Sequence, residues 1–131
     1  MSKQFLKKII AQSADDLQII SACCSESIIK ISDIKFLKKN KIFLISLNRI
    51  AKEDNQTKRI NSIIRFEYVH SSRSKNINQI NQNLEMELIS IDLFKKEKNY
   101  EITLLFSNNR FITLAVETIE VILEDQKNIN D

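Results

Sequence analysis

Side chains that could hold an anion gather between residues 49 and 75. Four of the five arginines of the chain lie in this stretch, together with several lysines. Arginine is well suited to bidentate contacts with phosphate and carboxylate groups. The hypothesis is one basic patch that binds nucleic acid, a phosphorylated small molecule or an acidic protein surface; the alternative is that these charges only solubilise polar strand faces. The residues assigned to the basic patch are Arg49, Lys58, Arg59, Arg65, Arg73 and Lys75.

Nucleic acid is the less favoured ligand of such a patch. Nucleic-acid binders usually add exposed aromatic side chains on which bases stack, whereas only Tyr68 interleaves with the basic residues here. The net charge of the chain is +3, which is low for a protein that must neutralise many phosphates. A protein partner is therefore expected ahead of nucleic acid.

Acid–base catalysis has few candidates. His70 is the only histidine and so the only side chain with an ordinary pKa near neutrality. Its neighbours Ser71 and Ser72 are too close in sequence to serve as its nucleophile without special geometry. Glu85 and Glu87 share one face of an expected strand, and such carboxylates are usually solvated. No catalytic residue is assigned, and an enzyme with a carboxylate site is kept as an alternative.

The chain contains no glycine and no proline. Phosphate loops, dinucleotide-binding turns and calcium loops need glycine for close backbone approach or for a sharp turn. Zinc is also unexpected, because Cys23, Cys24 and His70 are the only soft ligands and adjacent cysteines have the wrong spacing. We therefore expect no metal and no cofactor. Turns must be made by Asn, Asp, Ser or Lys, which tolerate left-handed backbone or bond their own main chain.

Apolar residues at helical spacing predict a helix near the N-terminus. Leu17, Ile20 and Cys24 recur with the period of an α-helix, and Ser13 is suited to cap its first turn. The spacing predicts a helix over residues 14–24, with Cys24 packed in the core. Neighbouring cysteines rarely form a disulfide, so a reducing compartment is expected.

A second helix is predicted at the C-terminus. Ile119, Ile122 and Leu123 also lie at helical spacing, which predicts a helix over about 117–126. The polar residues 127–131 are expected to form a frayed tail.

Alternating apolar and polar residues predict about seven strands. In one of them the alternation slips, because Ile29 and Ile31 have one parity while Ile34 and Phe36 have the other. A β-bulge near Ser32 would bring all four to the same face. The predicted strands cover residues 5–11, 28–37, 42–50, 60–70, 85–94, 100–106 and 110–116.

These elements predict an α+β fold that is mostly antiparallel β-sheet. Strand edges must be covered or paired, so we expect a small pleckstrin-homology-like barrel, closed by the C-terminal helix, or a strongly bent sheet. The whole chain, 1–131, is expected to be a single domain. Residues 71–84 are rich in Ser, Asn and Gln and are predicted to be a mobile loop.

The chain shows no apolar stretch long enough to span a membrane and no secretory signal. It is therefore expected to be cytoplasmic and not to contact membranes. Self-association through a sheet edge is left open by the sequence.

Several short segments carry a resemblance to a known family. They are residues 14–22 (ADDLQIISA), 32–37 (SDIKFL), 43–45 (FLI), 47–49 (LNR), 64–66 (IRF) and 115–120 (AVETIE). With them the chain resembles a family of small alphaproteobacterial proteins called domain of unknown function 2948. The family generally has a glycine at the position of Ser32, and arginines where this chain has Lys58 and Arg59. The resemblance implies a bacterial, cytoplasmic, stand-alone protein and no established activity.

Taken together, the residues favour a non-catalytic binding or adaptor module with a protein partner. Binding of nucleic acid or a phosphate-bearing ligand through the basic patch is the first alternative. An enzyme whose carboxylate site a single sequence does not reveal is the second.

Overall fold

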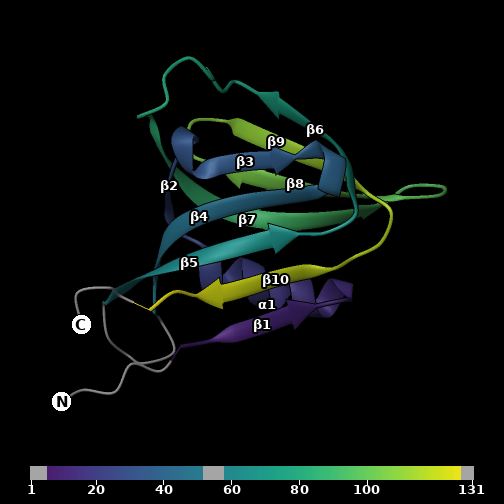
Figure 1. Ribbon diagram of the computed structural model, residues 1–131, viewed down its shortest axis with the longest axis horizontal. Helices are drawn as coiled ribbons and strands as arrows, with labels where there is room; N and C mark the ends of the chain where they lie inside the picture. The colour runs from purple at the N-terminus through teal and green to yellow at the C-terminus, as the bar shows by residue number, and fades with distance from the viewer. Residues whose placement is uncertain (1–5, 52–57, 128–131) are drawn as a thin grey trace.

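The fold of this chain is built almost wholly from β-strands (Figure 1). The structure, a computed structural model, describes residues 6–51 and 58–127. Within these residues lie ten strands, one α-helix and two short 3₁₀ turns. The elements are β1 (Lys8–Ala11), α1 (Ala14–Cys24), β2 (Ile28–Lys30), η1 (Ile31–Asp33), β3 (Ile34–Leu37), η2 (Lys38–Asn40), β4 (Ile42–Ile50), β5 (Arg59–Phe66), β6 (Val69–Lys75), β7 (Glu85–Lys95), β8 (Tyr100–Phe106), β9 (Arg110–Val116) and β10 (Val121–Asp125).

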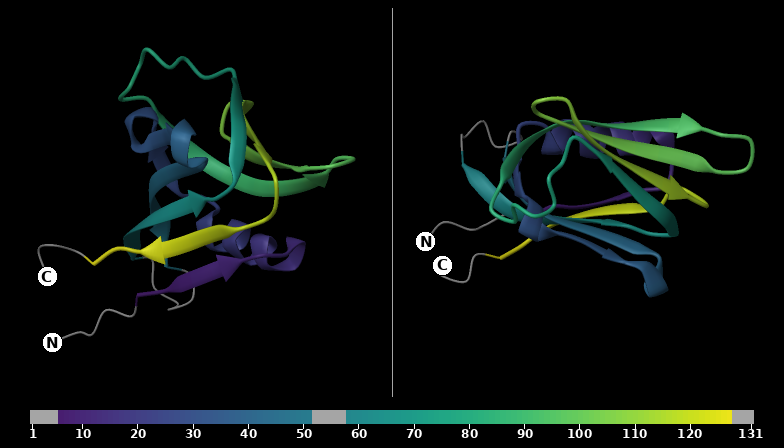
Figure 2. Two further views of the ribbon diagram at one scale, coloured as in Figure 1. Left: turned by 45° about the vertical axis from the view of Figure 1, so that its right-hand side comes forward. Right: turned by 90° about the horizontal axis from the view of Figure 1, so that it is seen from above.

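The strands form one antiparallel sheet in the order β1-β10-β5-β4-β2-β7-β8-β9-β6, with β3 paired to β4 beside β2. In Figures 1 and 2, β1, β10, β5 and β4 lie on one side of the molecule, and β7, β8 and β9 lie on the other. The inward side chains of both halves meet in one hydrophobic cluster. Within residues 6–51 and 58–127, the path ends at β1 and at β6, which have one strand partner each, so the sheet is not closed.

Helix α1 packs against β7, β1 and β4 and forms where the sequence predicts it. The Ser13 side chain accepts a hydrogen bond from the backbone amide of Asp16, which satisfies one of the free N–H groups of the first turn. Leu17, Ile20 and Cys24 are buried, which confirms the helix over 14–24 and the core position of Cys24. No helix in the described part of the chain is long and apolar enough to cross a membrane.

The predicted C-terminal helix over 117–126 is wrong. Residues 121–125 form β10, which lies between β1 and β5 and pairs with both. Val121, Leu123 and Asp125 are buried and point into the molecule at the period of a strand. As a strand, this segment supplies a hydrogen-bonding partner to β5 and to β1, which a helix could not do. Apart from Lys127, the predicted tail over 127–131 lies outside the described residues.

The predicted closed barrel of about seven strands is also wrong. The described residues contain ten strands, partly because the predicted strands over 28–37 and 60–70 are each two shorter elements. Without a C-terminal helix, nothing in the described part of the chain closes the sheet as we expected. The two ends of the path, β1 and β6, do not pair with each other.

The phase slip near Ser32 is produced by a 3₁₀ turn rather than by a bulge. Turn η1 separates β2 from β3 and adds the offset that the alternation requires. Ile29 and Ile31 are buried, and Ile34 and Phe36 pack against the same core. All four side chains therefore reach one face, as the sequence predicts.

The turns use residues other than glycine in left-handed backbone. Asn76, Asn108 and Asn109 have positive φ, in line with the tolerance of asparagine for this region. Lys41 and Tyr68 also have positive φ. Tyr68 is the corner at which the predicted strand over 60–70 breaks, so that β6 leaves β5 and pairs with β9 instead.

Candidate binding cleft

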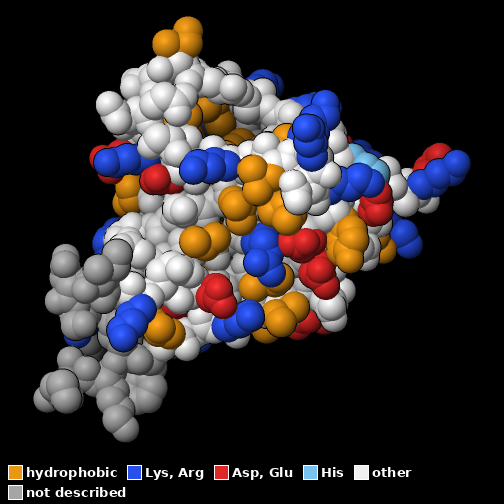
Figure 3. Space-filling view, viewed as in Figure 1, with side chains coloured by type: hydrophobic (Ala, Val, Ile, Leu, Met, Phe, Trp, Pro, Cys, Tyr) orange, Lys and Arg blue, Asp and Glu red, His pale blue; other side chains and the backbone are white. Residues whose placement is uncertain are grey.

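A cleft opens between β3 on one side and β6 on the other, two strands that do not pair with each other. Its volume is about 320 Å³, at the lower end of the size of ligand pockets. Figure 3 shows the hollow near the top of that face, with hydrophobic side chains at its base. Its lining residues are Ile31, Ile34, Phe36, Phe43, Ser72, Ser74, Ile77, Gln79, Gln82 and Ile112.

The cleft combines an apolar base with a neutral polar rim. The base is formed by isoleucines and by Phe36 and Phe43, whose rings pack at a centroid distance of 6.1 Å. On the rim the Gln79 amide donates to the Ser74 hydroxyl at 3.1 Å. None of the described residues that line the cleft carries a charged side chain. Such a surface suits an apolar group whose neighbouring polar atoms can form hydrogen bonds.

Both ends of the cleft are held by backbone hydrogen bonds. At one end the amide of Val69 donates to the carbonyl of Lys41 at 2.8 Å. At the other end the amide of Ser32 donates to the carbonyl of Gln82 at 3.0 Å. Between these two anchors, no strand of the described part of the chain pairs with β3 or β6 across the gap. The backbone hydrogen bonds therefore fix the positions of both ends of the cleft.

The free edge of β6 directs main-chain groups toward this opening. The Val69 amide bonds to Lys41, away from β9, and a bulge follows between Val69 and Ser71. In an antiparallel pair, successive residues direct their amides to alternate sides. Beyond the bulge, the residues opposite Leu114 and Ile112 are Ser72 and Ser74, and this alternation turns their N–H and C=O groups to the free edge.

The end of the cleft near Val69 carries a small charged cluster. The carboxylate of Glu117 lies 3.0 Å from the Lys41 amine and 3.0 Å from Nε2 of His70. The hydrogen bond from Lys41 is the largest influence on Glu117; desolvation opposes it, and the charges of Lys41 and His70 assist it, so the pKa of Glu117 lies below its ordinary value. The cluster links the η2 turn to the start of β6.

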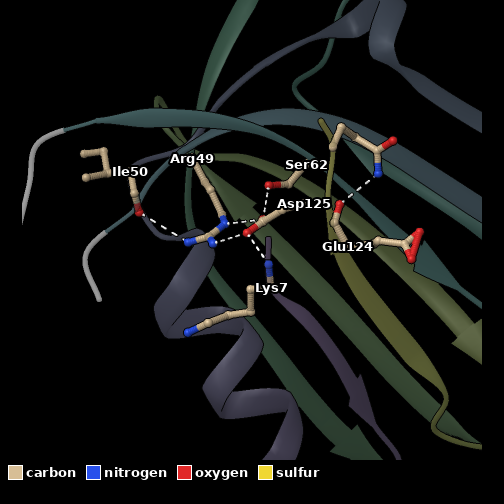
Figure 4. A network of polar contacts seen from close by, with 7 residues as sticks. Lys7, Arg49, Ile50, Ser62, Glu124 and Asp125 are labelled. Atoms are coloured by element: carbon tan, nitrogen blue, oxygen red, sulfur yellow. Dashed lines mark hydrogen bonds and ion pairs between the residues drawn. The ribbon is translucent and has the colours of Figure 1, made fainter. Parts of the chain in front are cut away.

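Arg49, assigned to the basic patch, is buried and fully inside the fold (Figure 4). Its Nε and Nη2 atoms donate to the two carboxylate oxygens of Asp125 at 2.9 and 2.7 Å. The Ser62 hydroxyl and the backbone amide of Lys7 donate to the same carboxylate at 2.7 and 2.9 Å. We call these four residues the Arg49–Asp125 cluster. It joins β4, β5 and β10 to the residue preceding β1.

Charge in this cluster is stabilised by hydrogen bonding. Burial alone would raise the pKa of Asp125, but hydrogen bonds from Arg49, Ser62 and the Lys7 amide, with the charge of Arg49, bring it below its ordinary value. Asp125 is thus held as a carboxylate. Both carboxylate oxygens of Asp125 accept hydrogen bonds from within the protein, so we assign the Arg49–Asp125 pair a role in holding the fold.

The other patch residues are exposed but are not brought together. Lys58 and Arg59 lie at the start of β5, and Arg59 donates to the Asn48 carbonyl at 3.1 Å. Arg65, at the other end of β5, pairs with Glu67 at 2.8 Å. Strand β6 is not a neighbour of β5 in the sheet.

Two patch residues do lie beside the cleft. Arg73 and Lys75 are on β6, facing away from the core, and Arg73 pairs with Glu101 at 2.9 Å. Other exposed lysines lie across the gap on β3 and η2, and basic side chains flank the hollow in Figure 3. The lysines near the cleft that form no ion pair in the described part of the chain are Lys35, Lys38, Lys39 and Lys75.

The two carboxylates considered for acid–base chemistry lie on the surface. Glu85 and Glu87 are exposed on β7. Over residues 6–51 and 58–127, no three His, Cys, Asp or Glu side chains come together as a metal site would require.

The family assignment follows from a match over nearly the whole chain. Residues 7–130 match the family described as Protein of unknown function (DUF2948). The chain belongs to this family. The resemblance seen in the sequence is thereby confirmed, and the family description assigns no activity. No curated protein and no solved structure matches the chain.

Sequence reasoning missed the residues that line the cleft. Residues 71–84 were expected to be a mobile loop; the structure places 71–75 in β6 and uses the rest to cover one end of the cleft. Their mobility stays a prediction. A signal was available in the alternation of Ser72 and Ser74 with Arg73 and Lys75, which has the period of a strand.

Proposed function

We propose that this protein is a non-catalytic binding module that receives part of a partner protein in the cleft between β3 and β6. One observation carries the proposal: the cleft, of about 320 Å³, has an apolar base and lies between two strand edges that have no partner across it in the described part of the chain. Burial of apolar surface lowers the free energy of a complex, and a free strand edge can pair with a strand of another chain.

The compartment is part of the same proposal. Both cysteines are free thiols, Cys24 buried and Cys23 partly buried. Free cysteines are usual in proteins of the reducing cytoplasm. A cytoplasmic partner is therefore the one to seek.

The proposal is tested by photocrosslinking in cells of the source organism. A photoreactive phenylalanine analogue replaces Ser74, at the cleft, or Glu97, in the exposed turn between β7 and β8. We expect adducts of one discrete mass from the Ser74 position and none from the Glu97 position, read by immunoblotting and mass spectrometry. Equal labelling from both positions, or no adduct from Ser74, would overturn the proposal.

A second variant tests whether the crosslinked adduct depends on an open cleft or arises from any contact with the protein surface. Ile34→Trp fills the cleft from the β3 side, where the side chain is only partly buried. Combined with the Ser74 crosslinker, it should abolish the adduct while the circular dichroism spectrum stays unchanged. Persistence of the adduct would place its contact outside the cleft.

A further inference from the structure

We infer that the occupant of the cleft is an extended segment of a partner protein that adds to β6 as a strand and alternates apolar with acidic side chains. This inference rests on the proposed function and adds the chemistry of the partner. Three independent features carry it: the main-chain groups at the edge, the apolar base and the charges on the outer rim.

The main-chain groups call for another strand. Because of the bulge after Val69, the N–H and C=O groups of Ser72 and Ser74 point away from β9. No hydrogen bond to these groups from any other described segment is found. An added strand satisfies such groups in pairs, and this is how many domains bind extended peptides. A small molecule would satisfy them only in part.

The base of the cleft fixes the inward side chains of that segment. A strand lying along β6 directs every second side chain toward the core. There it would meet Ile34, Phe36 and Ile112, with no charged group in the lining. Inward positions therefore take apolar side chains of moderate size.

The outer rim fixes the remaining side chains. Positions that point outward from an added strand would lie beside Arg73 and Lys75 on β6 and across from Lys35 on β3. Lys35 and Lys75 have no acidic partner in the described part of the chain, and Arg73 has Glu101. Glutamate or aspartate at the outward positions would neutralise this excess of positive charge.

The two anchors limit the length of the segment. Strand β3 spans four residues, Ile34–Leu37, between the fixed ends of the opening. At about 3.3 Å per residue, four paired residues cover roughly 13 Å. The segment therefore needs two inward apolar positions flanked by acidic ones.

The inference is tested with synthetic peptides and the intact protein. The probe is a fluorescein-labelled pentapeptide with blocked ends, Glu-Val-Glu-Ile-Glu, which carries two inward apolar positions flanked by acidic ones. Its matched controls carry Lys in place of every Glu, or N-methyl groups on alternate amides so that one edge cannot pair. By fluorescence anisotropy we expect each control to bind at least about tenfold more weakly, as expected for losing charge attraction or paired hydrogen bonds.

Protein variants locate the contact. Ser72→Pro removes the amide that points to the free edge, a position where proline is compatible with an edge strand. It should weaken peptide binding about tenfold or more, with Ser72→Ala, which keeps the amide, losing several-fold less. Lys35→Glu with Lys75→Glu should reverse the preference between the acidic and basic peptides. The matched change Lys95→Glu with Lys98→Glu, on the distant β7–β8 hairpin, should not.

Each remaining outcome overturns the inference in a different way. If decanoate shifts the backbone NMR signals of the cleft and no peptide does, the occupant is a small amphipathic molecule. If sedimentation shows a dimer of the protein alone that Ser72→Pro dissolves, the occupant is a second copy. Binding that is indifferent to N-methylation excludes strand addition. These results leave the crosslinking test, and so the proposed function, to stand or fall separately.

Discussion

The Arg49–Asp125 cluster and the cleft between β3 and β6 are two places where polar groups lie beside the core of one sheet. In the cluster these groups are paired with one another, whereas at the cleft the main-chain groups of the strand edges are unpaired in the part of the chain that the structure describes. In the cluster, the carboxylate of Asp125 receives hydrogen bonds from two side chains and one backbone amide. At the cleft, the facing edges of β3 and β6 have no strand partner among the described residues.

The difference separates what holds the fold from what is left for a ligand. An unpaired charge inside a protein is very costly, so a buried Arg must be matched almost completely. Main-chain groups at an exposed edge are hydrated and cost little in the free protein. The edge can therefore remain unpaired in the free protein and form hydrogen bonds when a partner binds.

The largest effect is expected from breaking the cluster. Asp125→Ala leaves the buried guanidinium of Arg49 without its carboxylate and should destabilise the protein by about 3–5 kcal/mol. Chemical denaturation followed by circular dichroism measures the change. Because the single variant could fail to fold, Arg49→Met with Asp125→Leu is the control, and it should recover most of the loss. Equal losses in both variants would contradict a buried pair.

An isoleucine-to-alanine change should lower the free energy of unfolding less at the cleft than in the core. Ile64 is fully buried on β5, and Ile64→Ala should cost about 2–5 kcal/mol. Ile77 lines the cleft and is only partly buried, so Ile77→Ala should cost less than about 1 kcal/mol. Urea midpoints for the two variants make the comparison. Similar losses would mean that the cleft is as tightly packed as the core.

Acid should weaken the cluster selectively. The pKa of Asp125 is lowered in the folded protein, so its contribution is fully present above the unfolded value of about 3.9 and is lost as pH falls through the folded value. Stability measured from pH 7 to pH 2 should fall more steeply for the natural protein than for Arg49→Met with Asp125→Leu. Parallel curves would show that the cluster does not control the acid response.

The smallest and most local difference is expected along β6. From the register of β6 with β9 and the alternation of an antiparallel pair, we infer that the amides of Ser72 and Ser74 face the free edge and those of Ser71 and Arg73 face β9. Hydrogen exchange measured by NMR should be at least about tenfold faster at the first two. Addition of the acidic pentapeptide should slow exchange at Ser72 and Ser74 alone. A uniform rate along β6 would contradict the proposed orientation of its edge.

Much of the fold could be predicted because it depends on local spacing. Helix α1 follows from its cap at Ser13 and from apolar residues on one face. Strands β4, β8 and β9 occupy the predicted residues 42–50, 100–106 and 110–116. In these stretches the alternation is long enough to exclude a helix.

The C-terminal segment shows where spacing becomes ambiguous. Ile119, Ile122 and Leu123 fit a helix, yet Val121, Leu123 and Asp125 fit a strand equally well. In so short a stretch, the choice depends on which partner needs it. Without β10, strand β5 would have no neighbour on one side and Arg49 would have no carboxylate partner. Strand β10 supplies both.

The basic patch illustrates the same limit for a site. Nearness in sequence suggested that Arg49, Arg65 and Arg73 could act together. In the structure Arg49 is buried and Arg65 pairs with Glu67. Arg73 lies on β6, which is not adjacent to β5 in the sheet. The two residues between β5 and β6, Glu67 and Tyr68, form the corner that divides the patch.

By itself the sequence determined the class of the protein: its family, its antiparallel β-rich character, its first helix and the absence of glycine-dependent phosphate sites. These depend on composition and on contacts between near neighbours in the chain. Only the tertiary structure decided that the sheet stays open, that Asp125 neutralises Arg49, and that Ser72 and Ser74 line a cleft. The physical reason is that strand pairing and the neutralisation of buried charge join residues far apart in the chain, and local spacing carries no record of those pairings.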